Sequence, residues 1–498
     1  MSDGTVPARE VRALSSRLTP DFLEEQGIIP LGVEGDTLTV GVWRDDVQPD
    51  ALYQLEALLG ARVQVMRVPE EFARSSIRAL YGESSAQALI AAIGASAGEH
   101  TDDDAPAIDD LRALANEAPV IRLVSMLLTE ALEARASDVH LEAYPDLLRV
   151  RYRVDGVLQE APSPPRSMAP AVISRLKVMA NLDIAERRTP QDGRIRLPLQ
   201  DRQVDVRVST VPTLHGESVV LRLLDKESGT LELRALGMSA SDLARFEAVL
   251  TRTHGVVLAT GPTGSGKTTT LYAALQRLRT GREKILTVED PVEYQLAGIP
   301  QVPVNEKVGV TFASALRALL RQDPDVMLVG EIRDGETAEI VTQAALTGHL
   351  VLSTLHTNDA AGALTRLVDL GVAPFLVSAT VEAVLAQRLV RTVCRVCATR
   401  VPATDVERAT LSWPTLTQVT RGIGCDACRG SGYSGRIGVY ELLVLDEPMR
   451  AAITSGDGAT EVRRLARAGG VPELKDDGVR LVLEGVTTPE EVMRVCRT

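Results

Sequence analysis

The stretch Gly261-Pro-Thr-Gly-Ser-Gly-Lys-Thr268 fills every position of the pattern G-x-x-x-x-G-K-[ST]. An apolar run, Gly255 to Ala259, precedes it, and a run compatible with a helix, Thr268 to Arg279, follows it. A strand, a tight loop and a helix in this order are the context in which the pattern cradles phosphates. The glycines let the backbone approach a polyphosphate closely, and the N–H groups at the start of the helix point toward it. The stretch therefore predicts a loop that binds a nucleoside triphosphate.

We expect the loop to bind ATP with Mg²⁺. Lys267 would reach the β- and γ-phosphates, and the Thr268 hydroxyl would bind Mg²⁺. The expected nucleotide-binding residues are Gly261, Pro262, Thr263, Gly264, Ser265, Gly266, Lys267, Thr268 and Thr269.

Two further apolar runs end in acidic residues. The first, Lys284-Ile-Leu-Thr-Val-Glu289-Asp-Pro-Val-Glu293, is predicted to be a buried strand. Either Glu289 or Glu293 would orient or deprotonate the attacking water, although the acids also fit an ordinary strand end. The second, Asp325-Val-Met-Leu-Val-Gly330-Glu331, has the form of a Walker B element with glycine where many such elements carry Asp. Contact with Mg²⁺ would therefore fall to Glu331, through water.

A third predicted strand lies in Thr347 to Asp359 and carries polar residues where it leaves the sheet. His356 or Ser353 would sense the γ-phosphate, while His349 would link the strand to its loop. A lone histidine on a strand is usually structural, so the neighbouring motifs carry this interpretation.

Phosphoryl transfer also needs positive charge to balance the charge that develops on the γ-phosphate. Arg194 and Arg207 lie on predicted short strands or turns, well before the phosphate loop. An arginine supplied by another domain or subunit accelerates such reactions by about 10³–10⁵. The alternative is that both arginines form surface salt bridges.

Four cysteines form two C-x-x-C pairs, Cys394 with Cys397 and Cys425 with Cys428, and Cys496 stands apart as an uncommitted thiol. In a reducing compartment two such pairs indicate a metal site more than disulfides. Four thiolates complete the tetrahedral shell of Zn²⁺, so the site would be structural. A redox motif is the alternative, but a thioredoxin-type C-x-x-C occurs singly.

The composition restricts the possible partners. The chain has 498 residues, a net charge of −13 and 3% aromatic residues, which argues against gripping a nucleic acid. The N-terminus lacks the apolar core of a signal peptide. The most apolar stretch, Val368 to Leu389, is interrupted by Asp369, Glu382, Gln387 and Arg388. We therefore expect a cytoplasmic protein that meets a membrane only through a partner.

We expect an α/β protein with three folded parts. Residues 1–85 would form a small α/β module with strands at 36–42 and 62–68 and helices near 18–23 and at 49–59. Residues 86–115 would be an acidic flexible linker. A strand-rich second domain would follow at 116–235, with a hairpin at Asp155-Gly156. The ATPase domain would occupy 236–498, with the zinc subdomain at 390–440 and a terminal helix that Thr488 and Glu491 cap.

Taken together, the motifs resemble those of the secretion ATPase superfamily, specifically the type II secretion and type IV pilus assembly ATPases. The resemblance covers roughly residues 15–498. It rests on the phosphate loop 261–268, Glu289-Asp-Pro-Val-Glu293, Gly330-Glu331-Ile-Arg-Asp334, Thr347 to His356, Ala136-Ser-Asp-Val-His-Leu-Glu142, Gln191-Asp-Gly-Arg194, and Gly424-Cys-Asp-Ala-Cys428 with the glycine-rich run that continues to Glu441.

The resemblance implies a RecA-like P-loop ATPase domain, a PAS-like second domain and a tetracysteine zinc subdomain. Six chains would form a ring with ATP between the second and third domains, and Arg194 and Arg207 would reach the phosphates on closure. Residues 1–85 would bind the cytoplasmic domain of the inner-membrane platform protein, placing the ring at the cytoplasmic face of that membrane.

The short N-terminal module favours the type II secretion branch, in which hydrolysis drives pseudopilus assembly and protein export. A pilus-extension motor is the nearest alternative, and the tetracysteine element argues against a retraction motor. A nucleic-acid translocase and a scaffold that binds nucleotide without hydrolysing it are the alternatives from other classes.

Overall fold

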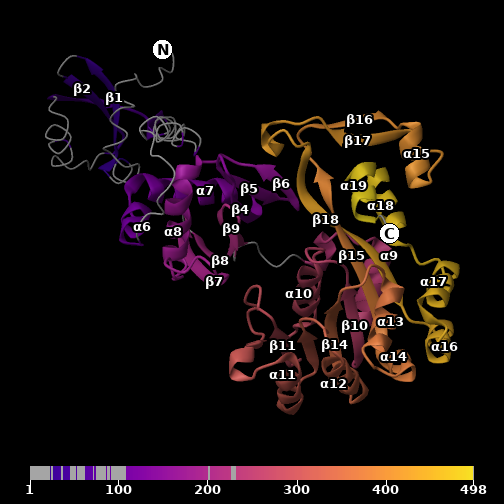
Figure 1. Ribbon diagram of the computed structural model, residues 1–498. Helices are drawn as coiled ribbons and strands as arrows, with labels where there is room; N and C mark the ends of the chain where they lie inside the picture. Colours follow the sequence, from indigo (N-terminus) through magenta and orange to yellow (C-terminus); the bar gives the residue numbers. More distant parts are fainter. Residues whose placement is uncertain are drawn as a thin grey trace. The chain divides into compact units, whose positions relative to one another are not determined.

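The computed structural model describes residues 26–34, 37–44, 62–70, 108–199, 202–225 and 232–496, with a few single positions between 23 and 90 (Figure 1). The chain divides into two compact units, Met1–Leu223 and Leu224–Thr498. The predicted helices near 18–23 and at 49–59, and most of the predicted linker, lie outside the described residues.

The first unit begins with a three-stranded sheet. Strand β1 (Ile28–Glu34) pairs antiparallel with β2 (Thr37–Val42), and β2 pairs parallel with β3 (Arg62–Arg67). Leu38 and Val40 alternate with more exposed residues and are fully buried. This period of two is typical of a strand and agrees with the strand predicted at 36–42, and β3 lies where the second strand was predicted, at 62–68.

A six-stranded sheet forms the rest of the first unit, in the order β6-β5-β4-β9-β8-β7. Asp155 and Gly156, both with positive φ, close the predicted hairpin between β5 and β6. The sheet packs against helices through a core that includes Leu123, Leu127 and Val172. The elements are α6 (Ile108–Ala115), α7 (Ala118–Glu133), β4 (Ala136–Ala143), β5 (Leu148–Val154), β6 (Val157–Glu160), α8 (Ala169–Met179), β7 (Gln191–Leu199), β8 (Arg202–Thr213) and β9 (Gly216–Asp225).

The end of the predicted linker is folded. Residues 108–115 form α6, whose Ala115 is fully buried and whose Leu114 packs against the core of the six-stranded sheet. The prediction of a flexible linker is therefore wrong for these residues, because the acidic composition hid a short amphipathic helix. Gln191 to Arg194, described in the sequence as a strand or turn, lie on strand β7.

The second unit is built on a seven-stranded sheet in the order β12-β11-β13-β14-β10-β15-β18. All neighbouring pairs are parallel except β15 with β18. The elements that position the site are α9 (Ala240–Leu250), β10 (Gly255–Thr260), α10 (Lys267–Leu278), β11 (Ile285–Glu289), β12 (Gln301–Pro303), α11 (Phe312–Leu319), β13 (Val326–Val329), α12 (Gly335–Leu346), β14 (Leu350–Leu355), α13 (Ala360–Asp369), α14 (Pro374–Thr380), β15 (Val381–Val393) and β18 (Tyr433–Val444).

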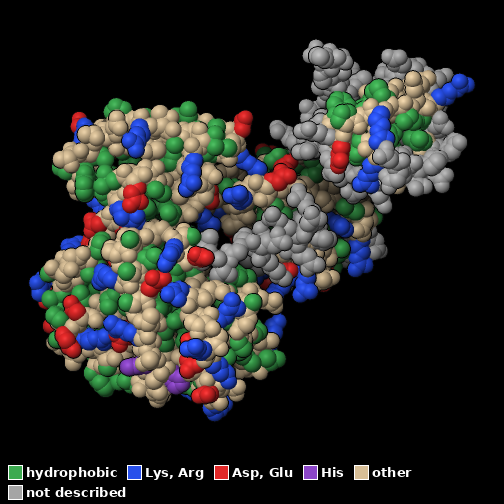
Figure 2. All heavy atoms as spheres, turned by 180° about the vertical axis from the view of Figure 1, so that it is seen from behind, with side chains coloured by type: hydrophobic (Ala, Val, Ile, Leu, Met, Phe, Trp, Pro, Cys, Tyr) green, Lys and Arg blue, Asp and Glu red, His purple; other side chains and the backbone are tan. Residues whose placement is uncertain are grey.

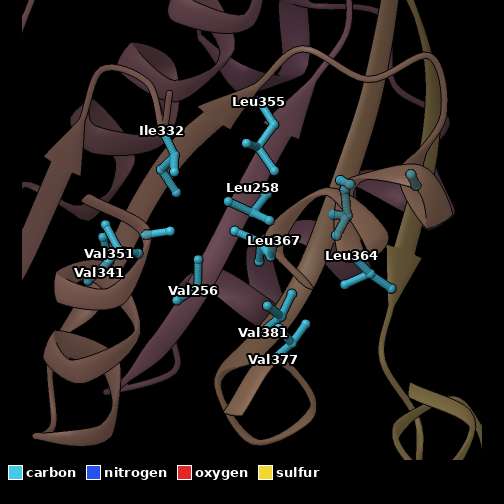
Figure 3. Close-up of a cluster of buried hydrophobic side chains, with 14 of the residues drawn as sticks. Val256, Leu258, Ile332, Val341, Val351, Leu355, Leu364, Leu367, Val377 and Val381 are labelled. Atoms are coloured by element: carbon cyan, nitrogen blue, oxygen red, sulfur yellow. The ribbon is translucent and has the colours of Figure 1, made fainter. Parts of the chain in front are cut away.

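Helices cover both faces of this sheet, so its central strands are buried throughout and mostly apolar. Val256 and Leu258 of β10 face one core with α12, α13 and α14 (Figure 3). Val257 and Ala259 face a second core with α9 and α10. The alternation sends successive side chains to opposite faces, as in doubly wound parallel sheets. The arrangement confirms the predicted RecA-like α/β fold.

The C-terminal elements complete the second unit. The hairpin of β16 (Ala398–Pro402) and β17 (Gln418–Gly422) carries α15 (Asp405–Leu411), and its core is shared with α18 and α19. The helices are α16 (Glu447–Ser455), α17 (Gly458–Ala468), α18 (Leu474–Leu483) and α19 (Pro489–Cys496). Thr488 caps α19, as predicted, by accepting a hydrogen bond from the Glu491 N–H at 3.4 Å. The Glu491 carboxylate does not return to Thr488, because Arg391 and Arg494 bind it.

Candidate functional site

The phosphate loop joins the carboxyl end of β10 to the first turn of α10. Gly261 and Gly266 have φ of +145° and +88°. A Cβ at Gly261 would lie 2.5 Å from the Gln387 carbonyl oxygen, so this position requires glycine for space as well as conformation. The Lys267 ammonium donates to the carbonyl oxygens of Gly261 and Pro262, at 2.7 and 3.1 Å. The backbone carbonyls of the loop therefore bind the Lys267 ammonium at the start of α10.

Lys267 is buried, and its surroundings act on its charge. Burial lowers the pKa of Lys267 to about 8, Arg388 acts in the same direction, and Glu331 opposes both. A polyanion beside this amine would favour its charged form.

Glu331 follows the end of β13, beside the phosphate loop. The Gly330 N–H donates to the Val288 carbonyl at 2.8 Å, and a Cβ at Gly330 would lie 3.3 Å from the Glu289 Cα. The close approach of β11 thus leaves little room for a Cβ at this position of the Walker B element. The Glu331 carboxylate contacts Arg333 and lies 3.3 Å from the His356 Nε2.

Polar residues of the third predicted strand separate into two groups. Ser353 is fully buried and donates to the Val329 carbonyl at 2.8 Å, so its hydroxyl joins β14 to β13. His356, half exposed, extends past the end of β14 to Glu331. His349 Nδ1 lies 3.1 Å from the Thr347 hydroxyl in the preceding loop, which links strand to loop as predicted, and 2.9 Å from the Ala344 carbonyl in the last turn of α12. Of the two candidate sensors, His356 is the one beside Glu331.

Glu289 and Glu293 lie in different surroundings. Glu289 is 3% exposed and accepts hydrogen bonds from Tyr272, from Thr287 at 2.6 Å and from Gln301 at 3.0 Å. Glu293 is partly exposed, in the loop that follows β11. The three donors to Glu289 were not recognised in the sequence, because the identity of a polar residue does not show which residue it will contact in the folded chain.

Arg194 and Arg207 are direct neighbours across the antiparallel pair β7–β8. Arg194 is exposed and Arg207 is partly buried. Two cations directly opposite each other on a sheet repel one another. Such a pair is suited to an anion that contacts both guanidinium groups.

The four predicted cysteine ligands lie together. All four Sγ atoms are within 4.8 Å of one another, and the distances Cys394–Cys425, Cys397–Cys428 and Cys425–Cys428 are 3.9, 3.8 and 3.7 Å. Tetrahedral Zn–S bonds of about 2.3 Å would place sulfur atoms about 3.8 Å apart. Burial raises the pKa of the Cys428 thiol, but the N–H groups of Cys425 and Gly432, at 3.2 Å, outweigh it and lower the pKa. The donor set and its spacing fit Zn²⁺.

Comparisons with known proteins place this site in a family. The family model described as type II/IV secretion system protein matches residues 113–494, and that of the MshEN domain matches residues 4–87. The chain belongs to the type II/IV secretion system protein family. It is 48% identical to type II secretion system protein E of Pseudomonas aeruginosa, over 99% of each chain. It is 46% identical to type II secretion system ATPase E of Vibrio cholerae, over 91% of this chain and 94% of that one.

Two solved structures share the fold. The ATPase DotB of Legionella pneumophila matches with a TM-score of 0.58 and 20% identity, over 79% of this chain and 97% of that one. The pilus retraction motor PilT, solved with bound ADP, matches with a TM-score of 0.51 and 25% identity, over 74% and 96%. The chain is an ATPase of the secretion family, as its motifs predict. None of the described helices is both long and apolar enough to cross a membrane.

Proposed function

We propose that this protein hydrolyses ATP to drive pseudopilus assembly and protein export through a type II secretion system. One observation carries the proposal. A chain that matches type II secretion system protein E over 99% of both lengths also brings an intact phosphate loop, Glu331 and His356 to one edge of its sheet. In open α/β sheets this carboxyl edge is where ligands bind.

At this edge the loop N–H groups and Lys267 would hold the phosphates. Thr268 and Glu331 would hold Mg²⁺, which neutralises charge on the phosphates when it is bound. Lys267 would exchange its two backbone carbonyl partners for phosphate oxygens, and His356 would report the γ-phosphate to Glu331. These roles are inferred from the positions of the side chains around the phosphate loop.

We assign the catalytic base to Glu293. The burial of Glu289 and its three hydrogen-bond donors suit a group that braces β11 against α10, and they leave its carboxylate little freedom to accept a proton from water. Glu293 follows the same strand and is partly exposed, which suits a group that contacts water.

The paired arginines support a ring. In the proposal six chains assemble, and Arg194 and Arg207 contact the phosphates when the second domain closes, within a chain or across a subunit boundary. An arginine supplied in this way ties hydrolysis to assembly. Residues 1–85 would bind the cytoplasmic domain of the inner-membrane platform protein, and the ring would work at the cytoplasmic face of that membrane.

The proposed zinc is structural. Cys394, Cys397, Cys425 and Cys428 would fill all four positions of the metal, with none left for a reacting water. The metal would then hold the β16–β17 hairpin to the end of β15 and the start of β18.

The test compares cells carrying wild type with cells carrying Lys267→Ala. We expect the variant to fold, to lose ATP hydrolysis in the purified protein, and to lose extracellular proteins while surface pili remain. Loss of pili with secretion intact would move the protein to the pilus-assembly branch. Full secretion by the variant, with hydrolysis abolished, would refute the proposal.

A nucleic-acid translocase is the alternative from another class. Lys and Arg side chains are interspersed with Asp and Glu on the face shown in Figure 2, without a continuous basic band. With a net charge of −13, this surface does not favour a nucleic-acid backbone. Salt-sensitive stimulation of hydrolysis by DNA would favour the translocase.

A further inference from the structure

Arg388 lies beside the phosphate loop, on a strand that the nucleotide motifs do not include. Strand β10 pairs with β15 on one side and β14 on the other, with Thr260 opposite Ala386 and Leu355. The loop that begins at Gly261 is therefore flanked by Gln387 and Arg388 of β15 on one side and by His356, which follows the end of β14, on the other.

The β15 side supports the loop closely. The Gln387 side chain is 2% exposed and accepts a hydrogen bond from the Thr270 hydroxyl in the first turn of α10, at 2.8 Å. The side-chain amide nitrogen of Gln387 lies 2.7 Å from where a Cβ would stand at Gly266, and its main-chain carbonyl oxygen lies 2.5 Å from the corresponding point at Gly261. Both ends of the phosphate loop thus rest on one residue.

Arg388 extends this support to the loop that follows β14. Its guanidinium donates to the Gln387 carbonyl at 3.1 Å and to the Asn358 carbonyl at 2.8 Å. The Nη1 atom also lies 3.0 Å from the Cβ point at Gly261. One planar group therefore spans from the start of the phosphate loop to a residue two places after His356.

Asn358 belongs to a short loop with other ties of its own. Thr357 is bound to Thr260 at the end of β10, through its N–H at 2.9 Å and its hydroxyl at 2.7 Å. Asp359 caps α13 and pairs with Arg463 at 2.8 Å. The hydrogen bond from the Arg388 guanidinium to the Asn358 carbonyl joins this loop to β15, the strand whose Gln387 supports the phosphate loop.

We propose that Arg388 is a positioning residue that holds residues 356–359, the His356 loop, in a fixed position relative to the phosphate loop. The proposal rests on the proposed function, because it assigns His356 to the γ-phosphate. Arg388 would act through His356 and Glu331, so its loss should slow the chemical step more than it weakens nucleotide binding. Lysine cannot replace it, since one ammonium does not reproduce a planar fork that reaches two carbonyls.

The test uses the full chain with Arg388→Lys and Arg388→Gln, and Arg400→Gln as a control at an exposed arginine of β16. Three quantities are measured for each: kcat, the Kd of a fluorescent ATP analogue, and amide hydrogen exchange in peptides that cover residues 354–362. We expect both Arg388 variants to lose at least about tenfold in kcat, with Kd within about threefold of wild type. In both Arg388 variants the rate of amide hydrogen exchange should rise severalfold in peptides that cover residues 354–362 and stay unchanged in peptides of α10.

Arg388→Lys keeps the charge, so it reports on the fork even if Arg388→Gln fails to fold. A kcat within twofold of wild type, unchanged exchange, or equal losses in kcat and affinity in the lysine variant would overturn the assignment. If wild type itself hydrolyses no ATP, the proposed function fails, and exchange at residues 354–362 still decides the contact.

Discussion

Replacing Glu441 with glutamine should make the ATPase unit more stable at alkaline pH. Glu441 lies on β18, and one of its oxygens accepts a hydrogen bond from the Ala360 N–H at 3.2 Å. Burial raises the pKa of Glu441 to about 7 from its ordinary 4.5, Asp359 and Glu473 act in the same direction, and the Ala360 N–H and Arg463 oppose them. The folded chain therefore binds this proton more tightly than the unfolded chain does.

The sign and size follow from linkage. Because the folded pKa is the higher one, stability falls as pH rises from about 4.5 to about 7 and then levels off. A shift of about 2.5 units corresponds to about 3 kcal/mol of destabilisation at pH 8, and to less than about 1 kcal/mol at pH 5. Glutamine has nearly the same shape and no charge, so Glu441→Gln should regain most of this difference at pH 8 and little at pH 5.

Scanning calorimetry of the full chain measures the effect. For a unit of this size, 1 kcal/mol shifts the Tm by about 2–4 °C, so the transition of the ATPase unit should rise by about 6–12 °C at pH 8. Glu339→Gln is the control, since Glu339 is exposed on α12 and contacts Gln343. A fall at pH 8 would show that Glu441 is a stabilising carboxylate, and an equal rise at both pH values would show that its ionisation is not the cause. Either result would refute the reasoning.

Three other predictions concern the site. Glu293→Gln should lower kcat by about 10²–10⁴ without changing the Tm. Glu289→Gln should lower the free energy of unfolding by about 1–3 kcal/mol, because one of the donors to Glu289 loses its acceptor. Unfolding and turnover assays on both variants decide which acid is the base. Arg194→Ala should lower kcat far more than nucleotide affinity, and Arg196→Ala, beside it on β7, should change neither; equal losses of affinity and kcat would make Arg194 a binding residue only. Elemental analysis should find one zinc per chain, and Cys425→Ser should release it and increase proteolysis within the β16–β17 hairpin, while a metal-free wild type would contradict the zinc assignment.

The elements of the ATPase unit could be predicted because local patterns specify them. The phosphate loop, the acidic ends of β11 and β13, and the four cysteines are short motifs whose chemistry depends on neighbours in the sequence. The strands around them are mostly apolar, which is typical of a sheet covered on both faces. The fold class followed directly from these features.

What could not be predicted depends on contacts between distant residues. The sequence shows Gln387 and Arg388 only as polar interruptions of an apolar stretch, and nothing local places them beneath the phosphate loop, more than 100 residues earlier. The same holds for Glu289: its structural role, and with it the choice of Glu293 as the base, depends on Tyr272 and Gln301, which contact Glu289 only in the folded sheet. The acidic composition led to a wrong prediction at α6, because a few apolar residues are enough to pack a short helix against a core that already exists.

Residues that are poor local choices gather around the His356 loop. Ionisation of Glu441 destabilises the fold, the pKa of Arg388 is lowered by burial, and Gly330 follows β13 at a point where a Cβ would lie 3.3 Å from the Glu289 Cα. Glu441 and Arg388 bind the backbone of Ala360 and Asn358, and Gly330 sets the position of its neighbour Glu331. Proteins accept such conflicts mainly where function needs them, since a fully relaxed sheet edge would be apolar and better packed. Their convergence on one loop supports the proposal that function depends on the position of this loop relative to the phosphate loop.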